Sequence, residues 1–391
     1  MERSIIDNLR LAKAGEEQCK WFKKRMPVLK AVRNIFLNDK PLNGKSIVIC
    51  MHIEPKTAVW IDALLSGGAR EITLIGCVGT TQPPTAAFLA SRKHVSVLGR
   101  EHDTYRTQKK YIKQALSLKK DIILDNGGST VIEWHSGKYK WTPLGATEET
   151  KSGKNQIESK VKSPLLPIVV IDDSPLKKTL ENTIGVGQSV VDGIMRATSL
   201  LLGGKRVLII GYGWCGRGIA ARMRGMGAIP MVHDINPIKL LQAKMEGNIV
   251  NSCERLLPLA DIIITVTGRE SVLTKSHYTK MKDGVVLCNA GHFSSEIDLN
   301  ALSKAFTKEK INDHIDAYSS GNKTIYLLEN ADLINLSAAD GNPIEIMDMG
   351  LGMHALAAAA IADEKRPLKK EIQPVPQQIN HDLAELCLRL F

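Results

Sequence analysis

A glycine-rich turn between two apolar segments constrains the fold of this chain more than any other feature of its sequence. The apolar run 207–210 is typical of a buried parallel strand, and it leads directly into Gly211, Gly213 and Gly216 in a G-x-G-x-x-G pattern. A helical pattern follows, and a second strand then ends in Asp234. Strand, turn, helix and strand in this order predict one βαβ unit of a doubly wound parallel sheet.

Each position in this turn has a mechanical reason. Gly211 permits the tight turn, Gly213 lets the backbone approach a pyrophosphate, and Gly216 lets the helix pack closely on the strand. The N-terminus of the helix offers free N–H groups to phosphates. Asp234 can accept hydrogen bonds from both hydroxyls of a ribose, and its charge would repel a 2′-phosphate. We therefore expect an NAD site rather than an NADP site; the alternative is a glycine-rich turn without a ligand.

Composition narrows the class of protein. The chain has 391 residues, enough for two domains, and a formal net charge of +11. Its basic residues are scattered, and the densest tracts, 20–25 and 365–370, read as solvated helix faces or a linker, so we expect no nucleic-acid partner. The seven cysteines lack C-x-x-C spacing, which favours buried free thiols in a reducing cytoplasm. We expect no signal peptide, no apolar run of membrane length and no membrane partner.

Strands alternate with helices along the whole chain, which predicts an α/β fold of two doubly wound, Rossmann-like domains. In the first part of the chain, strands are expected at 46–51 and 121–124, among others, and polar residues follow them directly, at His52 and Asp125. Ligands of such sheets bind at the carboxyl ends of the strands, so these residues are candidates for a site.

The dinucleotide-binding domain is expected to interrupt the other domain. A long helix at 187–202 leads into it, and a helix at 344–362 leaves it. The expected boundaries are a discontinuous substrate domain at 1–186 and 343–372, an NAD-binding domain at 187–342, and a short C-terminal tail at 373–391.

Further motifs lie on both sides of the glycine-rich turn. They are HIE at 52–54, KTA at 56–58, TTQ at 80–82, LDNGG at 124–128, EET at 148–150, DDSPLKKTLEN at 172–182, GVGQS at 185–189, GYGWCGRG at 211–218, NAGHF at 289–293 and DGNPIEIMDM at 340–349. In these motifs, and over nearly its whole length, the sequence resembles the S-adenosylhomocysteine hydrolase (adenosylhomocysteinase) family, most closely its archaeal and thermophilic-bacterial branch.

The resemblance implies an internal redox cycle on a nucleoside. Bound NAD oxidises the ribose 3′-hydroxyl, and the ketone acidifies the neighbouring 4′ hydrogen, which a base removes so that the 5′ thiol leaves. Water then adds, and the reduced cofactor reduces the ketone back. Such chemistry needs a group that takes the 3′-hydroxyl proton, further acid–base groups, and a closure that excludes water.

The resemblance also assigns roles to residues. Lys177 matches the lysine near the 3′-hydroxyl, where burial and the nicotinamide charge favour the neutral amine that can act as a base. Glu149 matches the acid that holds the ribose hydroxyls, and His52 matches an acid–base histidine. His292 matches a histidine beside the nicotinamide. The expected catalytic set is His52, Asp125, Glu149, Lys177, Glu181 and His292.

Contacts with cofactor and substrate follow from the same motifs. The expected cofactor-binding residues are Thr150, Asn182, Gly211, Gly213, Trp214, Cys215, Gly216, Asp234, Thr267, Asn289 and Asn335. The expected substrate-binding residues are Glu54, Lys56, Thr57, Gln82, Asn126 and Asn342. No metal is expected.

The sequence departs from the family mainly on the substrate side. Asn126 stands where the family has a second aspartate, and an amide cannot carry a proton. Glu181 replaces an aspartate that holds the ribose, which adds a methylene where an ångström matters. Asn342 replaces a histidine near the purine. Lys177 and His292 remain, so the redox side is kept while the substrate side is altered.

These observations predict an NAD-dependent enzyme that reversibly cleaves a thioether nucleoside through a 3′-keto intermediate. One alternative is NAD-dependent oxidation, epimerisation or elimination on a different nucleoside, which Asn126 and Asn342 favour. The other is a catalytically inactive NAD-binding paralogue, which Lys177 and His292 argue against. The resemblance also implies a homodimer or homotetramer in the cytoplasm, with a small nucleoside as the substrate.

Overall fold

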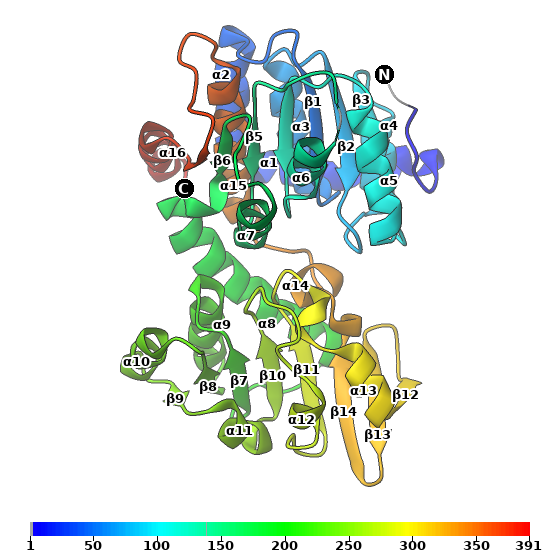
Figure 1. Cartoon of the computed structure of the whole chain (residues 1–391), viewed down its shortest axis with the longest axis vertical. Coiled ribbons are helices and arrows are strands. Elements are labelled where there is room, and N and C mark those ends of the chain that lie inside the picture. Colours follow the sequence, from blue (N-terminus) through cyan, green and yellow to red (C-terminus); the bar gives the residue numbers. More distant parts are fainter. Residues whose placement is uncertain (1–2, 138) are drawn as a thin grey trace. The chain divides into compact units, whose positions relative to one another are not determined.

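The chain folds into two compact α/β units, one inserted into the other in sequence. The structure, a computed structural model, describes residues 3–137 and 139–391. Unit 1 combines the chain up to Lys177 with Ile344–Phe391, and unit 2 is Lys178–Pro343. Each unit has its own sheet with helices on its faces (Figure 1). This arrangement confirms the predicted fold class of two Rossmann-like domains with one inserted into a discontinuous partner.

Unit 1 is built on a parallel sheet of seven strands in the order β15-β6-β5-β4-β1-β2-β3. The chain moves outward from β1 in one direction and from β4 in the other, so the strand order reverses between these two neighbours. Such a switch point leaves a crevice at the carboxyl ends of the strands. The strands are β1 (Ser46–Met51), β2 (Glu71–Gly76), β3 (Val95–Leu98), β4 (Ile122–Asp125), β5 (Gly145–Glu148), β6 (Ile168–Val170) and β15 (Ile372–Pro374).

Both faces of this sheet are covered, so its strands are apolar without alternation. Alternate residues of β1, such as Val48 and Cys50, pack in one core cluster with side chains of α5, α6 and α7. On the other side, α15 packs against α2, α3 and β5. The helices are η1 (Leu9–Leu11), α1 (Ala12–Arg25), α2 (Pro27–Asp39), α3 (Pro55–Ser66), α4 (Pro83–Ala90), α5 (Tyr105–Leu116), α6 (Ser129–Ser136), α7 (Lys151–Lys160), η2 (Ile171–Asp173), α15 (Ile344–Ala362) and α16 (Gln377–Leu390).

Helix α15 corrects the expectation that the chain has no apolar run of membrane length. Among the described residues it is the one helix long and apolar enough, by length and composition, to cross a membrane. Most of it is buried inside unit 1, and a core helix covered on several sides is apolar around its whole circumference. Its buried Asp348 accepts hydrogen bonds from the N–H groups of Val28 (2.8 Å) and Leu29 (2.7 Å), which joins α15 to the start of α2.

The C-terminal segment, which the sequence predicts as a separate tail, contributes to unit 1. Strand β15 pairs in parallel with β6 and forms one edge of the sheet. Pro374 ends this edge strand, a position that tolerates the missing N–H of proline. Helix α16 packs on α15 and α2 through buried residues that include Leu383 and Cys387.

Unit 2 contains an eight-stranded sheet in the order β12-β13-β14-β11-β10-β7-β8-β9. Five strands, from β11 to β9 in this order, are parallel, and β14 joins them in parallel while also pairing antiparallel with β13. The strands are β7 (Arg206–Ile210), β8 (Ile229–His233), β9 (Ile249–Val250), β10 (Ile262–Thr265), β11 (Val285–Asn289), β12 (Thr307–Lys310), β13 (Ile315–Ser320) and β14 (Lys323–Leu328).

The central strand β7 explains the uniform apolarity of the run 207–210. Val207 and Ile209 pack in one core cluster with α8 and α9, whereas Leu208 and Ile210 pack in a second cluster on the opposite face. The helices of this unit are η3 (Lys177–Gly185), which begins at the end of unit 1, α8 (Val186–Thr198), α9 (Trp214–Gly225), α10 (Pro237–Met245), α11 (Cys253–Leu256), η4 (Leu257–Leu259), α12 (Lys275–Tyr278), η5 (Ser294–Glu296), α13 (Leu299–Ala305), η6 (Glu329–Ala331) and α14 (Ile334–Ser337).

Candidate functional site

The glycine-rich turn of unit 2 has the geometry that its sequence predicts. Gly211 has a φ of +106°, and a Cβ there would lie 2.7 Å from the carbonyl oxygen of Val266. A Cβ at Gly216 would lie 2.0 Å from the carbonyl oxygen of Gly211, so the start of α9 approaches the turn closely. At Gly213, by contrast, a Cβ would meet nothing within 4 Å. Gly211 and Gly216 are therefore needed by the fold, whereas Gly213 leaves open space at the N-terminus of α9 that suits a phosphate.

Asp234, directly after β8, is fixed at the carboxyl end of the neighbouring strand. Its Oδ2 accepts a hydrogen bond from the N–H of Tyr212 (2.7 Å), and its Oδ1 accepts one from the N–H of Asn236 (2.8 Å). The amine of Lys239 lies 3.7 Å from Oδ2. A carboxylate oriented in this way beside the glycine-rich turn fits the ribose of a dinucleotide, so the residues present match NAD.

Two loops of unit 2 carry further expected cofactor residues, and a buried glutamate orders one of them. The Oε2 of Glu296 accepts hydrogen bonds from the N–H and the hydroxyl of Thr267, each at 2.9 Å, and its Oε1 accepts one from Gly268 N–H at 2.7 Å. Asn289 accepts hydrogen bonds from Gly291 N–H and Thr265 hydroxyl and donates to Ala331 and Phe293 carbonyls. Its side chain therefore shapes the 289–293 loop that presents His292.

The remaining expected residues of unit 2 lie on η3, α9 and α14 and in the segment that precedes Ile344. Asn335 donates a hydrogen bond to Ser189 hydroxyl (3.3 Å), which itself donates to Asn342 Oδ1 (2.9 Å). Expected residues that lie on η3 and at the start of α9 are Glu181, Asn182, Trp214 and Cys215. The predicted site residues thus divide between the two units.

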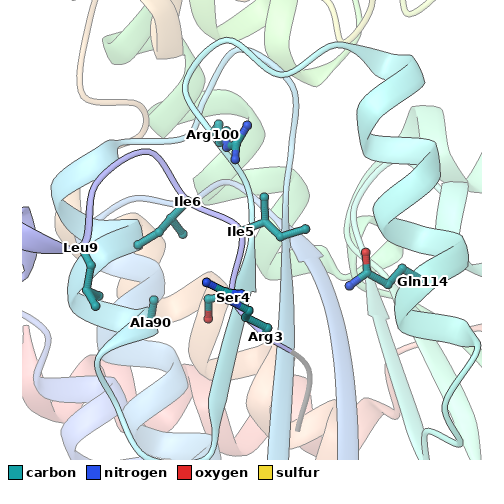
Figure 2. A pocket seen from close by; sticks show the side chains of 8 residues that line it. All are labelled: Arg3, Ser4, Ile5, Ile6, Leu9, Ala90, Arg100 and Gln114. Atoms are coloured by element: carbon teal, nitrogen blue, oxygen red, sulfur yellow. The ribbon is translucent and has the colours of Figure 1, made fainter.

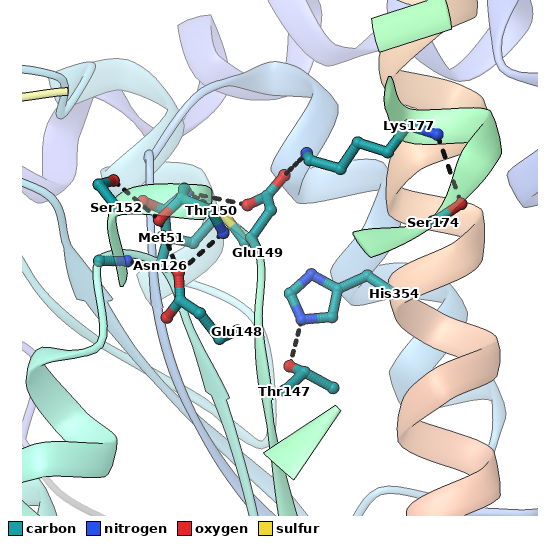
Figure 3. A network of polar contacts seen from close by, with 11 residues as sticks. Met51, Asn126, Thr147, Glu148, Glu149, Thr150, Ser152, Ser174, Lys177 and His354 are labelled. Atoms are coloured by element: carbon teal, nitrogen blue, oxygen red, sulfur yellow. Dashed lines mark hydrogen bonds and ion pairs between the residues drawn. The ribbon is translucent and has the colours of Figure 1, made fainter. Parts of the chain in front are cut away.

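In unit 1, a buried polar cluster lies at the carboxyl ends of β1, β4 and β5 (Figure 3). The amine of Lys177 lies 3.3 Å from Oε1 of Glu149, and the amide of Asn126 donates a hydrogen bond to Oε2 of Glu149 at 2.9 Å. All three side chains are at least nine-tenths buried. Burial raises the pKa of Glu149, but Lys177, His354, Asn126 and His52 outweigh it and lower that pKa to about 2. Glu149 is therefore an anion that accepts hydrogen bonds.

His52 follows β1 and belongs to the same cluster. Its Nδ1 lies 2.8 Å from the hydroxyl of Thr80, and its carbonyl accepts a hydrogen bond from Thr57 hydroxyl at 2.7 Å. Burial lowers the pKa of His52, while Glu149 acts against this shift. The imidazole is therefore neutral at pH 7 and can accept or donate a proton.

Other expected substrate residues of unit 1 lie on the segments that follow β1 and β2. Lys56 and Glu54 form a buried ion pair at 2.7 Å, in the first turn of α3. The N–H of Gln82 donates a hydrogen bond to the carbonyl of Ile53 at 2.9 Å, which ties the loop before α4 to the loop after β1.

Two carboxyl groups, those of Asp125 and Glu148, lie next to this cluster and accept hydrogen bonds from its loops. Asp125 accepts hydrogen bonds from the N–H groups of Thr130 (2.8 Å) and Val131 (2.9 Å) at the start of α6. Glu148 accepts them from Gly127 (3.0 Å) and Gly128 (2.8 Å) and from Thr150. Burial raises the pKa of Asp125 to about 6 and, with Asp125 nearby, that of Glu148 to about 8. Thr150, an expected cofactor residue, thus has its hydroxyl engaged by Glu148.

Sequence reasoning missed two residues that the structure places near these functional groups. His354 on α15 is fully buried beside Thr147 and contributes to the electrostatics of Glu149. Glu296 orders the Thr267 loop of unit 2. His354 is the one polar side chain in the otherwise apolar stretch 349–362, which was a signal for the first, whereas Glu296 lies in a segment without such a pattern.

A cavity of about 780 Å³ lies elsewhere in unit 1, against the N-terminal segment (Figure 2). Ile5 donates its N–H to Val97 carbonyl (2.7 Å) and accepts from Gly99 N–H (2.9 Å), so this segment covers the free edge of β3. Arg3, Arg100 and Gln114 are among the residues that line the cavity, and the lining includes none of the expected site residues.

Comparison with known proteins agrees with this geometry. The family model described as S-adenosyl-L-homocysteine hydrolase matches residues 3–210, and the model of that family's NAD binding domain matches residues 182–341. The S-inosyl-L-homocysteine hydrolase of Methanococcus maripaludis is 38% identical over 392 residues, which cover 98% of this chain and 94% of the relative. The enzyme of the same name from Methanocaldococcus jannaschii is 36% identical over 389 residues, with coverage of 98% and 94%.

A bacterial relative carries a different name. The adenosylhomocysteinase of Aquifex aeolicus is 36% identical over 390 residues, which cover 98% of this chain and 93% of the relative. These matches confirm the predicted resemblance and NAD as the cofactor. The chain therefore belongs to the S-adenosyl-L-homocysteine hydrolase family and carries that family's NAD-binding domain.

Proposed function

We propose that this enzyme catalyses the NAD-dependent, reversible hydrolysis of the bond between the 5′ carbon of a purine nucleoside and the sulfur of homocysteine. The observation that carries the proposal is the buried contact between Lys177 and Glu149, at 3.3 Å, with His52 beside it. An amine and a carboxylate held together at the end of a parallel sheet can bind the two hydroxyls of a ribose. The relatives are named for the S-inosyl and S-adenosyl forms of the substrate, so both forms are candidates.

The residues of unit 1 divide the work as follows. Glu149 accepts hydrogen bonds from the ribose hydroxyls. Lys177, in its neutral amine form, takes the proton of the 3′-hydroxyl. NAD, when bound, supplies the acceptor for the hydride of the 3′ carbon and returns it at the end of the cycle. His52, neutral at pH 7, carries the protons of elimination and water addition. His292 is expected to lie beside the nicotinamide.

A second candidate function is oxidation of a nucleoside hydroxyl for an end other than cleavage. The observation that favours it is Asn126, whose Nδ2 donates to Glu149 while its buried Oδ1 has no partner among the described residues. An amide in this position binds a hydroxyl but cannot exchange a proton. The elimination step would then depend on His52 and on other groups.

The test is thiol release from S-adenosylhomocysteine and from S-inosylhomocysteine, measured with a thiol reagent while the reduced-nicotinamide absorbance is followed. The unmodified protein is expected to release homocysteine from at least one of them. Lys177→Met should abolish release because no amine remains to take the 3′-hydroxyl proton, and Lys178→Met is the matched control. Absorbance change with a nucleoside but no thiol supports the second candidate. If no nucleoside produces either the thiol or the absorbance change, both candidate functions are contradicted.

We further propose that the enzyme is a cytoplasmic homo-oligomer. Unit 2 carries an apolar surface on α10, formed by Ile238, Leu241 and Met245, which are 76%, 58% and 73% exposed. Their helical spacing places them on one face, and Ile235 and Ile249, which precede and follow α10 in sequence, are exposed as well. Another copy of the chain would cover this surface. The free cysteines in the described part of the chain suit a reducing compartment.

A further inference from the structure

His354 lies in the middle of α15, in the apolar stretch 349–362 of that helix, near the Glu149–Lys177 pair (Figure 3). The side chain is fully buried. Its Nε2 contacts the hydroxyl of Thr147 on β5, and its ring stacks on the indole of Trp60 on α3, with centroids 4.7 Å apart and an interplanar angle of 29°. Two elements therefore fix the orientation of the imidazole.

The second ring nitrogen, Nδ1, has no hydrogen-bond partner among the described residues. Figure 3 shows this edge of the ring turned toward Glu149 and Lys177, away from Thr147. Buried polar atoms without partners are rare in folded proteins because desolvation is costly, and they gather where a ligand or a mechanism requires them. The position of Nδ1 therefore points to a role in the site above it.

The charges around the ring determine where its hydrogen lies. Burial lowers the pKa of His354 to about 4, Glu149 acts to raise it, and Lys177 acts more weakly to lower it. The ring is thus neutral at pH 7, and the nearby anion favours a hydrogen on the nitrogen that faces it. Nε2 then accepts from Thr147. Around Glu149 itself, the other facing groups are Asn126 after β4 and His52 after β1.

We propose that His354 is a positioning residue whose neutral Nδ1–H faces the Glu149 carboxylate, takes up part of its charge, and so loosens the hold of Glu149 on the proton of Lys177. The inference rests on the proposed function, in which Lys177 must lose that proton before it can accept one from the 3′-hydroxyl. Without this donor, the charge of Glu149 holds the proton of Lys177 more strongly, and Lys177 becomes a neutral amine only at higher pH.

The kinetic test compares His354→Leu and His354→Gln in the full-length, NAD-loaded protein, with the rate of nicotinamide reduction by nucleoside measured from pH 6 to 10. His354→Leu should move the rising part of the pH–rate profile to higher pH by about one unit. The rate of nicotinamide reduction should then be about tenfold lower near neutral pH and should recover at high pH. His354→Gln keeps an N–H donor and should restore most of the profile. His135→Gln, which changes a half-buried histidine on α6, is the matched control. A loss by the same factor at every pH, or no loss, overturns the proposal.

A second measurement does not depend on turnover. In protein labelled with ¹⁵N-histidine, the imidazole signals that vanish in His354→Gln belong to His354. They should report a neutral ring with its hydrogen on Nδ1 at pH 7. A hydrogen on Nε2, or a doubly protonated ring, overturns the proposal. If no nucleoside reduces the cofactor, the proposed function fails by itself, while this spectrum still decides the state of His354.

Discussion

At the residue scale, the two carboxylate oxygens of Glu149 have different partners, and the proposed chemistry depends on this difference. Oε1 faces Lys177, whereas Oε2 accepts a hydrogen bond from Asn126. The amide holds the carboxylate without adding a charge or a transferable proton. An aspartate at 126 would place two carboxyl groups together, and one of them would keep a proton at neutral pH.

We therefore predict that Asn126→Asp accelerates release of the 5′ thiol more than it changes oxidation. A missing acid–base group typically costs about 10²- to 10⁴-fold, so a gain of at least tenfold is expected in thiol release. Nicotinamide reduction should change only a few-fold, because Lys177 and its contact with Glu149 remain. Rapid mixing with separate absorbance and thiol detection checks this. An equal change in both signals, or none in thiol release, would show that position 126 carries no protons.

At the scale of elements, Glu148 joins β5 to the loop after β4. Burial and Asp125 raise its pKa to about 8, so the folded state binds more protons than the unfolded state between about pH 4.5 and 8. The stability contributed by this group is therefore present at low pH and is lost as the pH rises through 8. His52 and His354 have lowered pKa values and act in the opposite direction, but only below about pH 6.5.

Glu148→Gln should isolate this effect between pH 6.5 and 8. The variant should be less stable at pH 6.5, because its amide nitrogen carries two hydrogens among the N–H groups that donate to Glu148, whereas the protonated carboxyl group carries one. The difference from the unmodified protein should narrow toward pH 8 by about 1–2 kcal/mol, the order of one proton per molecule over this window. Urea unfolding at each pH measures it. Parallel profiles of the two proteins would mean that Glu148 does not titrate here.

At the scale of the whole molecule, the proposed assembly would use the apolar face of α10. We predict that Ile238→Asp combined with Leu241→Lys lowers the oligomeric state, because charges replace exposed apolar contacts. Light scattering at micromolar concentration measures the mass, and the exposed Leu388→Lys on α16 serves as control. If the unmodified protein is a monomer, the assembly proposal is contradicted. If the double variant keeps the mass of the unmodified oligomer, the interface lies elsewhere on the protein.

The sequence predicted those parts of the fold in which neighbours along the chain determine the structure. The turn at Gly211 is one such case, because local backbone geometry requires glycine at Gly211 and Gly216. Contacts between segments that lie far apart in the sequence could not be predicted from the sequence pattern. Asp348 caps a helix more than 300 residues earlier, and His354 contacts Thr147, which lies 207 residues earlier. The motifs located Glu149 and Lys177, but only the structure shows that Asp125 and Glu148 are engaged by backbone N–H groups.

The most direct test of the account is the order of two events in one turnover of the unmodified, NAD-loaded protein. Mixed rapidly with its thioether nucleoside, the enzyme should show reduced-nicotinamide absorbance first and free homocysteine afterwards, and Lys177→Met should show neither. This order follows because the 3′ ketone must form before the 4′ hydrogen becomes acidic enough to leave. Release of homocysteine while the nicotinamide stays oxidised throughout would contradict the account.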